Sequence, residues 1–347
     1  MAQVQSSDSP ASDLDSVVRL GKATADRLRV AILQVLHEES YSVSELCELF
    51  AVPQPALSHH LKILHQTGLV AKRREGNSIF YRRASQANLN SCNALQQAML
   101  TTIDQIPLAP ATAQRALAIH AARRARSEDF FARYAAEFAG QQARICEPVI
   151  YTDTVKDILE TTGVIAGQTV SGHALEVGPG DGHLLAWLAG HFAEVTGIDS
   201  SPSMLERARH NTQTLDSVTL RHCDFMELTG VDQHGLIIAA MVIHHLASPA
   251  NFFQQAKRLL QETGTLVVAE LCRHDQQWAS EVCGDHWLGF EPLELHEWAE
   301  RAGFHAIDSQ FLAQKNGFRI QIHSYQIDKS NSSSNTQTQP QCNGVTT

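Results

Sequence analysis

ALEVGPGDGH (174–183) is the stretch that decides the fold of the second half of this 347-residue chain. An apolar run stands directly before three glycines, Gly178, Gly180 and Gly182, and a helical segment follows them. This order is typical of nucleotide-binding α/β domains, in which glycines let a ligand approach the backbone. His183 stands where the dinucleotide fingerprint needs glycine or alanine, and no Walker lysine is present. The pattern therefore disfavours a nicotinamide cofactor.

Further apolar runs extend this pattern towards the C-terminus. Short runs separated by helical segments or loops predict strands at 174–177, 195–198, 218–221, 235–240 and 265–270. Strands that alternate with helices imply a parallel sheet covered by helices on its faces. The second half is therefore expected to be a Rossmann-like α/β domain.

Two acidic residues follow consecutive predicted strands. Asp199 lies about 20 residues beyond the glycines, where a carboxylate can accept both hydroxyls of a ribose. Asp224 follows the next strand, where it can accept from an adenine amine with Phe225 beside the ring. Each acid alone is more often a solvated loop residue. Together with the glycines, at the strand ends of one sheet, they predict a nucleoside-binding pocket.

This order resembles the class I S-adenosylmethionine-dependent methyltransferases over about residues 150–327. The motifs are EVGPGDG, IDSSPSMLERA and CDF; the fourth strand, in QHGLII, lacks the acid that often opens it. The resemblance implies S-adenosylmethionine or S-adenosylhomocysteine as the ligand. It places Glu176 near the amino-acid end, Asp199 on the ribose, and Met204 and Asp224 on the adenine. The complete set of implied binding residues is Glu176, Gly178, Gly180, Gly182, Asp199, Ser200, Met204, Asp224 and Phe225.

Two histidines stand where a methyl acceptor would approach. His244 and His245 follow the strand at 235–240, and they are the candidate general bases. Methyl transfer, however, needs mainly the in-line positioning of an existing nucleophile. The alternative is that they line the pocket or cap a helix, so the catalytic group stays open.

The first half carries a different pattern, centred on PQPALSHHLKILHQTG (53–68). Apolar residues recur at helical spacing between 14 and 36, with a break near 21–26. Ser42 and Glu45 form a capping box for a helix at 43–50. Pro55 suits the first position of the next helix, which ends before Gly68.

A basic hairpin follows these helices. Strands are expected at 69–74 and 78–83, with a turn at 75–77. Helices followed by such a hairpin give the order of a winged helix-turn-helix, whose last helix enters the DNA major groove. The side chains expected to contact DNA are Gln54, Ser58, His59 and Lys62 on that helix, and Lys72, Arg73, Arg74, Arg82 and Arg83 on the hairpin. The opposite face of the helix, Leu57, Leu61 and Leu64, is expected to face the core.

The stretch from DRLRVAIL to SIFYRR, about 70 residues long, resembles the ArsR/SmtB family of bacterial repressors. The resemblance implies a homodimer that binds an inverted-repeat operator. Many members of that family sense metals, and a soft ion needs several thiolates at once. Here Cys47 stands alone in ELCEL, so no metal is expected.

Charge separates the two halves. The formal net charge is −10, but residues 1–150 hold 16 basic and 14 acidic side chains, whereas residues 151–347 hold 11 and 23. An acidic half is a poor surface for nucleic acid, so DNA contact is expected in the first half. The predicted division is 1–12 disordered, 13–85 winged helix-turn-helix, 86–150 helical connector or dimerisation segment, 151–327 methyltransferase-like, and 328–347 disordered.

The chain shows no membrane or secretory signature. No run approaches the roughly 18 apolar residues of a membrane span, and the first residues lack the regions of a signal peptide. Seven cysteines with no CxxC pair favour a reducing compartment over a disulfide framework. A cytoplasmic protein without membrane contact is expected.

Both modules in one chain resemble the SahR-type regulators of the S-adenosylmethionine cycle. The resemblance implies a repressor of methionine-cycle genes whose effector, S-adenosylhomocysteine or S-adenosylmethionine, releases the operator. The alternative is an active small-molecule methyltransferase with an autoregulatory DNA-binding head. No substrate-binding insertion stands out, which favours the sensor. An arsenite methyltransferase is disfavoured, because Cys223, Cys272 and Cys283 show no thiolate motif.

Overall fold

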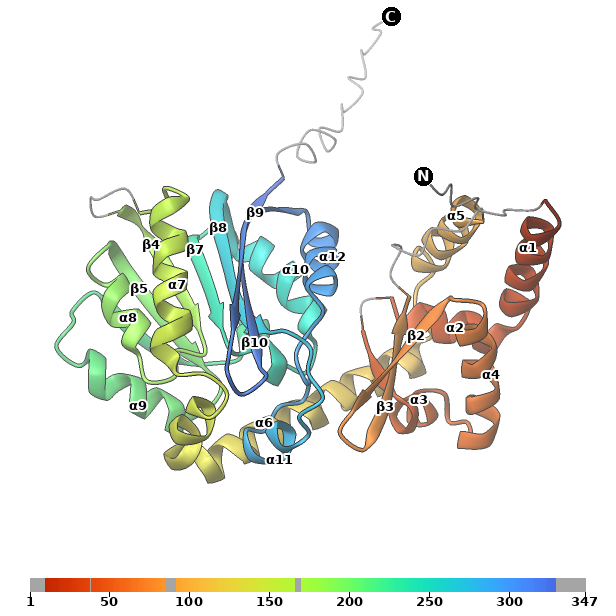
Figure 1. The fold of residues 1–347 in the computed structure, drawn as a ribbon, viewed down its shortest axis with the longest axis horizontal. Coiled ribbons are helices and arrows are strands. Elements are labelled where there is room, and N and C mark those ends of the chain that lie inside the picture. Colours follow the sequence, from red (N-terminus) through yellow and green to blue (C-terminus); the bar gives the residue numbers. More distant parts are fainter. Residues whose placement is uncertain (1–9, 38, 85–91, 166–169, 329–347) are drawn as a thin grey trace, which may run out of the picture.

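The computed structural model describes residues 10–37, 39–84, 92–165 and 170–328 (Figure 1). It consists of a head, residues 10–104, and a body, residues 148–328, which are joined by helix α6 (Pro110–Ala143). Most of the two terminal segments expected to be disordered lies outside the described residues. Helix α1 already begins at Pro10, within the first of these segments.

The head contains a three-stranded antiparallel sheet, in the order β1-β3-β2, packed against helices. Its elements are α1 (Pro10–Thr24), α2 (Arg27–Val35), β1 (Tyr41–Ser42), α3 (Val43–Phe50), α4 (Gln54–Gln66), β2 (Val70–Glu75), β3 (Ser78–Arg83) and α5 (Asn93–Asp104). This is the winged helix-turn-helix order that the sequence predicts, with β2 and β3 as the wing.

Local sequence signals in the head act as expected. The Ser42 hydroxyl accepts from the Glu45 amide at 3.2 Å, and the Glu45 carboxylate accepts from the Ser42 amide at 2.7 Å. This capping box opens α3. Gly68, with φ +72°, ends α4, and its left-handed backbone conformation favours glycine. The core-facing stripe of α4 is fully buried and comprises Leu57, Leu61 and Leu64.

Helix α6 belongs to both parts of the molecule. At 1.5 Å per residue its 34 residues extend for about 50 Å. Ala116 and Ile119 are buried in the head core, whereas Phe130 and Phe131 pack against Met204 of the body. Figure 1 shows α6 running from beneath the body into the head. The central part of the predicted connector (86–150) is therefore one continuous helix shared by two cores, whereas α5 packs in the head.

The body is built on a seven-stranded sheet with the order β6-β5-β4-β7-β8-β10-β9. Five strands are parallel, but β10 runs antiparallel to both β8 and β9. The strands are β4 (Val170–Val177), β5 (Phe192–Asp199), β6 (Val218–His222), β7 (His234–Ala240), β8 (Leu260–Leu271), β9 (Phe304–Ala313) and β10 (Arg319–Ile327). The sequence predicted the five parallel strands of this Rossmann-like domain and missed the last two, whose antiparallel pairing makes the sheet mixed.

Helices cover both faces of this sheet, and two apolar cores fill the space between them. The helices of the body are α7 (Pro148–Thr161), α8 (His183–Leu188), α9 (Pro202–Thr212), α10 (Pro249–Leu259), α11 (Trp278–Val282) and α12 (Pro292–Ala302), with short 3-10 turns η1 (Phe225–Glu227) and η2 (Ile243–His245). Parallel strands end at a common edge, so the loops after β4, β5, β6 and β7 meet there. Among the described residues, no helix is both long and apolar enough to cross a membrane.

Candidate ligand pocket and nucleic-acid interface

A cavity of about 330 Å³ opens at the carboxyl edge of the parallel strands. The loops that follow β4, β5, β6 and β7 form one side of it, and helix α6 forms another. All the predicted binding residues line it except Gly182. The structure thus brings together the strand-end residues that the sequence singled out.

The glycine loop after β4 has the backbone that only glycine adopts readily. Gly178 has φ +67°, and a Cβ there would meet the Val242 side chain at 2.7 Å. Gly182 has φ +77°, and a Cβ would lie 2.9 Å from the Ala208 carbonyl oxygen. Gly180 lines the cavity, with open space where its side chain would be. The first and third glycines are therefore required for packing, and the second leaves room for a ligand.

Glu176 is the second-last residue of β4 and lies in the cavity wall. Its side chain is 3% exposed, and its Oε2 has no hydrogen-bond partner among the described residues. Burial raises the pKa of this carboxyl well above its usual value. A buried acceptor without a partner is costly, so a cationic or donor group in the cavity would stabilise its ionised form.

Asp199 ends β5 on the same edge and lines the cavity with Ser200. Its Oδ1 accepts from the Ser201 amide at 2.8 Å, which fixes the carboxylate. Burial raises its pKa to about 6. Met204, which is 5% exposed, lies nearby at the start of α9.

Asp224 follows β6 and is already paired. Its Oδ1 accepts from the Met226 amide at 2.8 Å, and its Oδ2 accepts from the Arg124 guanidinium at 3.0 Å. Arg124 comes from α6 and also contacts Glu227 at 2.9 Å. Phe225, 3% exposed, packs mainly in the body core. The carboxylate predicted to receive an adenine amine thus holds the connector helix.

The adjacent Arg123 holds the head. Its guanidinium donates to both Glu45 oxygens, at 2.9 and 2.8 Å, and to the carbonyl of Ser40 at 2.8 Å. It also donates to the carbonyl of Ala247 in the body at 2.9 Å. Burial alone would raise the pKa of Glu45, but the Arg123 guanidinium outweighs it and lowers the pKa. Arg123 is 2% exposed and links α6, the start of α3 and the body.

The face of α4 that points away from the head core is exposed to solvent. All four side chains expected to contact base edges are exposed: Gln54, Ser58, His59 and Lys62. The predicted reading face of the head is thus available to DNA.

The wing divides its cations between two faces. Lys72 and Arg74 are exposed, but Arg73 is 7% exposed and faces the body. The Arg73 guanidinium pairs with Glu75 and, at 3.1 Å, with Glu294 of α12. Its expected contact with DNA phosphate is therefore not available in this arrangement, because successive residues of a strand point to opposite faces.

The two remaining wing cations are also engaged within the protein. Arg82 lies 3.4 Å from Glu294, and Arg83 pairs with Asp104 of α5. Phe80 of the wing packs on Trp287 of the body, with ring centroids 5.1 Å apart. One face of the wing is therefore an interface with the body.

Comparison with protein families assigns the two parts. Residues 26–72 match the family described as "Bacterial regulatory protein, arsR family" and residues 175–268 match "Methyltransferase domain". The chain joins an ArsR-family helix-turn-helix domain to a methyltransferase domain. The head carries the ArsR-family match, and the methyltransferase match covers β4 to β8 of the body.

Individual relatives cover one part at a time. The chain is 41% identical over 75 residues to the HTH-type transcriptional repressor SmtB of Mycobacterium tuberculosis, covering 22% of this chain and 56% of the relative. It is 25% identical over 151 residues to a ubiquinone biosynthesis O-methyltransferase of Coxiella burnetii, covering 39% and 64%. The chain therefore spans between about half and two thirds of these curated relatives.

A similar solved structure is that of Burkholderia thailandensis 1,6-didemethyltoxoflavin-N1-methyltransferase with bound 1,6-didemethyltoxoflavin and S-adenosylhomocysteine. It is 18% identical and aligns with a TM-score of 0.49 over 65% of this chain and 93% of that one.

Sequence reasoning missed the wall of the cavity that the connector supplies. This wall lies on α6, and its residues there are Leu117, His120, Ala121, Arg124, Ser127, Phe131 and Gln142. The only signal was the run RRAR at 123–126, a basic patch within an alanine-rich helix.

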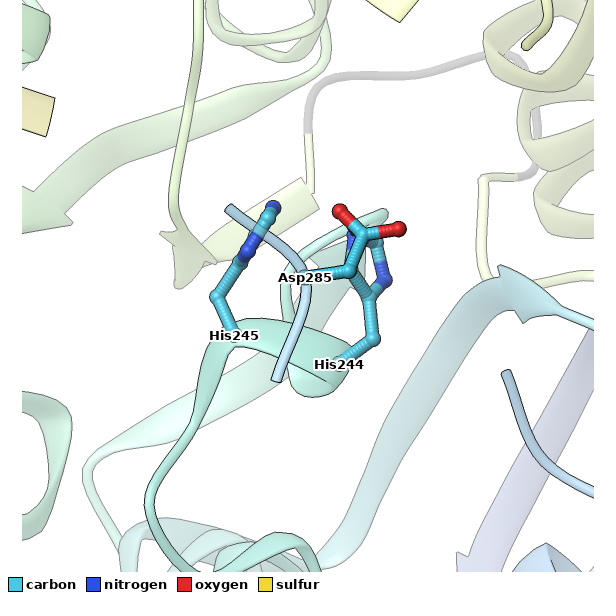
Figure 2. Close-up of side chains that lie close together, drawn as sticks. All are labelled: His244, His245 and Asp285. Atoms are coloured by element: carbon cyan, nitrogen blue, oxygen red, sulfur yellow. Dashed lines mark ion pairs between the residues drawn. The ribbon is translucent and has the colours of Figure 1, made fainter. Parts of the chain in front are cut away.

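The two adjacent histidines of the methyltransferase domain occupy different places. His245 lines the cavity, and its ring meets Phe131 edge-on at 5.0 Å. His244 is buried beside Glu270 and Asp285 and does not line the cavity (Figure 2). Burial lowers the pKa of His244, but these two carboxylates outweigh it and raise the pKa to about 9. His245 alone is placed to touch a ligand.

Proposed function

We propose that this chain is a DNA-binding transcriptional repressor of methionine-cycle genes, with S-adenosylhomocysteine or S-adenosylmethionine as its effector, as in SahR-type regulators. One observation carries the proposal: the cavity is built jointly by the strand ends of the body and by α6. The same helix holds α3 of the head through Arg123 and Glu45. A ligand in this cavity therefore contacts the element on which the DNA-reading part rests.

The cavity residues fit such a ligand. The unpartnered oxygen of Glu176 would accept from the ligand's ammonium group, and Asp199 would accept from the ribose hydroxyls. Asp224 would accept from the adenine amine, beside Met204. A volume of about 330 Å³ is near the lower end of ligand pockets, roughly 300–1,000 Å³. The cavity is therefore within the size range of sites that hold one small effector.

The head surface fits a DNA-binding dimer. The exposed face of α4 would read base edges, and Lys72 and Arg74 would contact phosphates. Large apolar side chains are exposed on α1 and α5, which suits a second copy of the chain. They are Leu14, Val17, Val18 and Leu95. Such a dimer would place two α4 helices on an inverted repeat.

Coupling would pass through α6. An adenine amine on Asp224 competes with Arg124 for the same carboxylate. Displacement of Arg124 moves α6 relative to the body, and Arg123 transmits that movement to α3 through Glu45. A ligand changes DNA affinity only if it binds one arrangement better than the other, and the effect is reciprocal.

The test is a DNA-binding titration of the full chain. A fluorescent inverted-repeat duplex, selected by the protein from a random pool, is titrated with and without each ligand. We expect S-adenosylhomocysteine to weaken DNA binding more than S-adenosylmethionine, because the sulfonium carries an extra charge and methyl group. Asp199→Ala should weaken ligand binding by about 1.5–3 kcal/mol, the scale of hydrogen bonds to a charged group. The matched control is Asp216→Ala, an exposed acid outside the cavity.

Two outcomes would overturn the proposal. Unchanged DNA affinity at saturating ligand would remove the sensor function, and methyl transfer from S-adenosylmethionine to small molecules would then be the function to assay. Equal ligand effects on the wild type and Asp199→Ala would place the receptor site elsewhere.

A further inference from the structure

Three buried side chains gather beside the cavity at the η2 turn. His244 and His245 rise from this turn, and Asp285 approaches from the loop before Leu288 (Figure 2). One ligand-type atom of each residue lies within 4.8 Å of the others. All three side chains are less than one tenth exposed. No other such group of three metal-ligand residues occurs within the described parts of the chain.

Both histidines have one ring nitrogen fixed by an acceptor. His244 Nδ1 contacts a carboxylate oxygen of Glu270, whose other oxygen accepts from the His244 amide at 3.2 Å. His245 Nδ1 lies 3.3 Å from the carbonyl oxygen of Gly284. Carboxylates and carbonyls only accept, so each Nδ1 is the donor, and each Nε2 is the nitrogen left to bind a metal ion, which would displace any proton on it. Metal-bound histidines are characteristically oriented in this way.

Asp285 supplies the second, independent observation. Its side chain is 2% exposed, yet neither carboxylate oxygen has a hydrogen-bond partner among the described residues. Its nearest cationic atom, His244 Nε2, is 3.7 Å away, which is longer than a hydrogen bond. An unsatisfied buried carboxylate is costly, and paired charges or a metal ion are the usual remedies.

We propose that His244, His245 and Asp285 bind a late first-row divalent metal ion such as Zn²⁺. Two imidazoles and one carboxylate are ligands that suit Zn²⁺, Co²⁺ and Fe²⁺, and three protein ligands leave an open position. Glu270 orients His244 as an outer partner. The Nε2 and carboxylate atoms must move closer, because metal–ligand bonds are about 2.0–2.2 Å long.

The site lies next to the contact between the two parts of the chain. The amides of His286 and Trp287 both donate to the His244 carbonyl at 3.1 Å. The His286 ring lies 3.0 Å from the Arg123 carbonyl of α6, and Trp287 packs on Phe80 of the wing. A metal bound to Asp285 would therefore fix the loop that touches α6 and the wing.

The experiment measures metal binding by the full chain after chelation. Zn²⁺ is titrated by calorimetry, and Co²⁺ is followed by its visible absorption. We expect one ion per chain, with nitrogen and oxygen ligands and no thiolate charge-transfer band. Asp285→Asn and His245→Asn should weaken binding at least tenfold, and Glu270→Gln by about 10–100-fold. The matched control is His286→Asn, which perturbs the same loop but removes no ligand, and it should bind as the wild type does.

Thermal unfolding separates loss of binding from loss of folding. At a Zn²⁺ concentration 100 times Kd, the Tm of the wild type should rise by roughly 5–10 °C. The Tm of Asp285→Asn should not respond to the ion. Less than one equivalent of bound metal, a thiolate spectrum, or unchanged affinity in Asp285→Asn would overturn the proposal and leave a buried ion-pair cluster. DNA and nucleoside binding do not enter these measurements, so the proposed regulator function stands or fails separately.

Discussion

Two Arg-Arg pairs, one in strand β2 of the wing and one in α6, show how the same dipeptide serves two surfaces. In β2, Arg73 is buried against the body and Arg74 is exposed. In α6, Arg123 is 2% exposed with four hydrogen bonds, whereas Arg124 is partly exposed and holds only two carboxylates. The first member of each pair joins the head to the body. The second faces solvent or the ligand cavity.

Burial, rather than charge, therefore decides whether each of these arginines is a fixed interface contact or an accessible one. Arg123 and Arg73 satisfy buried carboxylates, and their loss leaves uncompensated charge inside an interface. Arg124 and Arg74 are accessible, so their partners can be exchanged for a ligand or a phosphate. In each of these two pairs, a buried arginine that holds the interface is followed by an accessible arginine whose partner can be exchanged. The two roles can be tested separately.

The largest effect is expected for Arg123→Ala. The substitution leaves Glu45 largely buried without its guanidinium partner and removes two further hydrogen bonds, to the carbonyls of Ser40 and Ala247. Breaking such a pair costs about 3–5 kcal/mol. Chemical denaturation should show this loss in the first unfolding transition. Arg126→Ala, an exposed arginine on the same helix, is the control and should change stability by less than about 0.5 kcal/mol. Equal effects of the two substitutions would remove Arg123 as the anchor.

The next effect concerns Arg124→Ala and is a loss of coupling rather than of stability. Asp224 is then free for the ligand, so ligand affinity should hold or rise, while the ligand no longer moves α6. We expect the effect of S-adenosylhomocysteine on DNA affinity, about 1–3 kcal/mol for a typical coupling, to disappear. Glu227→Gln, which removes only the other partner of Arg124, should retain it. Full coupling in Arg124→Ala would exclude this contact as the route.

An intermediate effect is expected from pH at the cavity. Asp199 must be ionised to accept two hydroxyls, and burial raises its pKa to about 6. Ligand affinity should therefore fall as the pH decreases below 6, by up to about tenfold per pH unit. Without ligand the sign is reversed: a raised pKa favours the folded state at low pH, and that contribution is lost between about pH 4 and 6. Calorimetry at pH 5, 6 and 7.5 measures the first effect. A smaller pH dependence is expected in Asp199→Asn, and an equal one would assign the titration to another group.

The smallest effect is expected at the wing. Arg74→Ala should reduce the slope of log K against log salt by about 0.9, the value for one phosphate contact. Arg73→Ala should leave the slope unchanged and destabilise the contact with Glu294 instead. Salt titrations of both variants check the difference. A flatter slope in Arg73→Ala would mean that the wing leaves the body when DNA binds.

Local signals carried most of the successful predictions from sequence. The capping box of Ser42 and Glu45 and the glycine at 68 act within one turn of the backbone, so they can be predicted without knowledge of tertiary contacts. The meeting of the acids at 199 and 224 in one pocket can be predicted because parallel strands end at the same edge of a sheet. Strands 304–313 and 319–327 were missed. They follow the part of the chain with alternating strands and helices and pair antiparallel at the end of the sheet.

Tertiary contacts account for the remaining errors. Nothing in the sequence around Arg73 indicates that Glu294, 221 residues away, would bury it. Arg124 and Leu117 were predicted only as parts of a helical connector, because helix periodicity does not reveal which distant cavity a face will line. The cluster of His244, Glu270 and Asp285 joins three separate segments of the chain. From the sequence, only His244 and its neighbour His245 were singled out as candidates.

The cavity needs α6 as well as the sheet. A fragment of the chain could therefore keep the whole sheet and still lose part of the pocket. A cut between α6 and α7 would keep every strand and glycine of the sheet. It would also open the cavity on the side where Leu117, His120 and Phe131 stand. A free-standing relative of the body must close that side with other residues. A fragment that begins at α7 would therefore lack one wall of the pocket, so ligand binding by the body is to be measured on a chain that keeps α6.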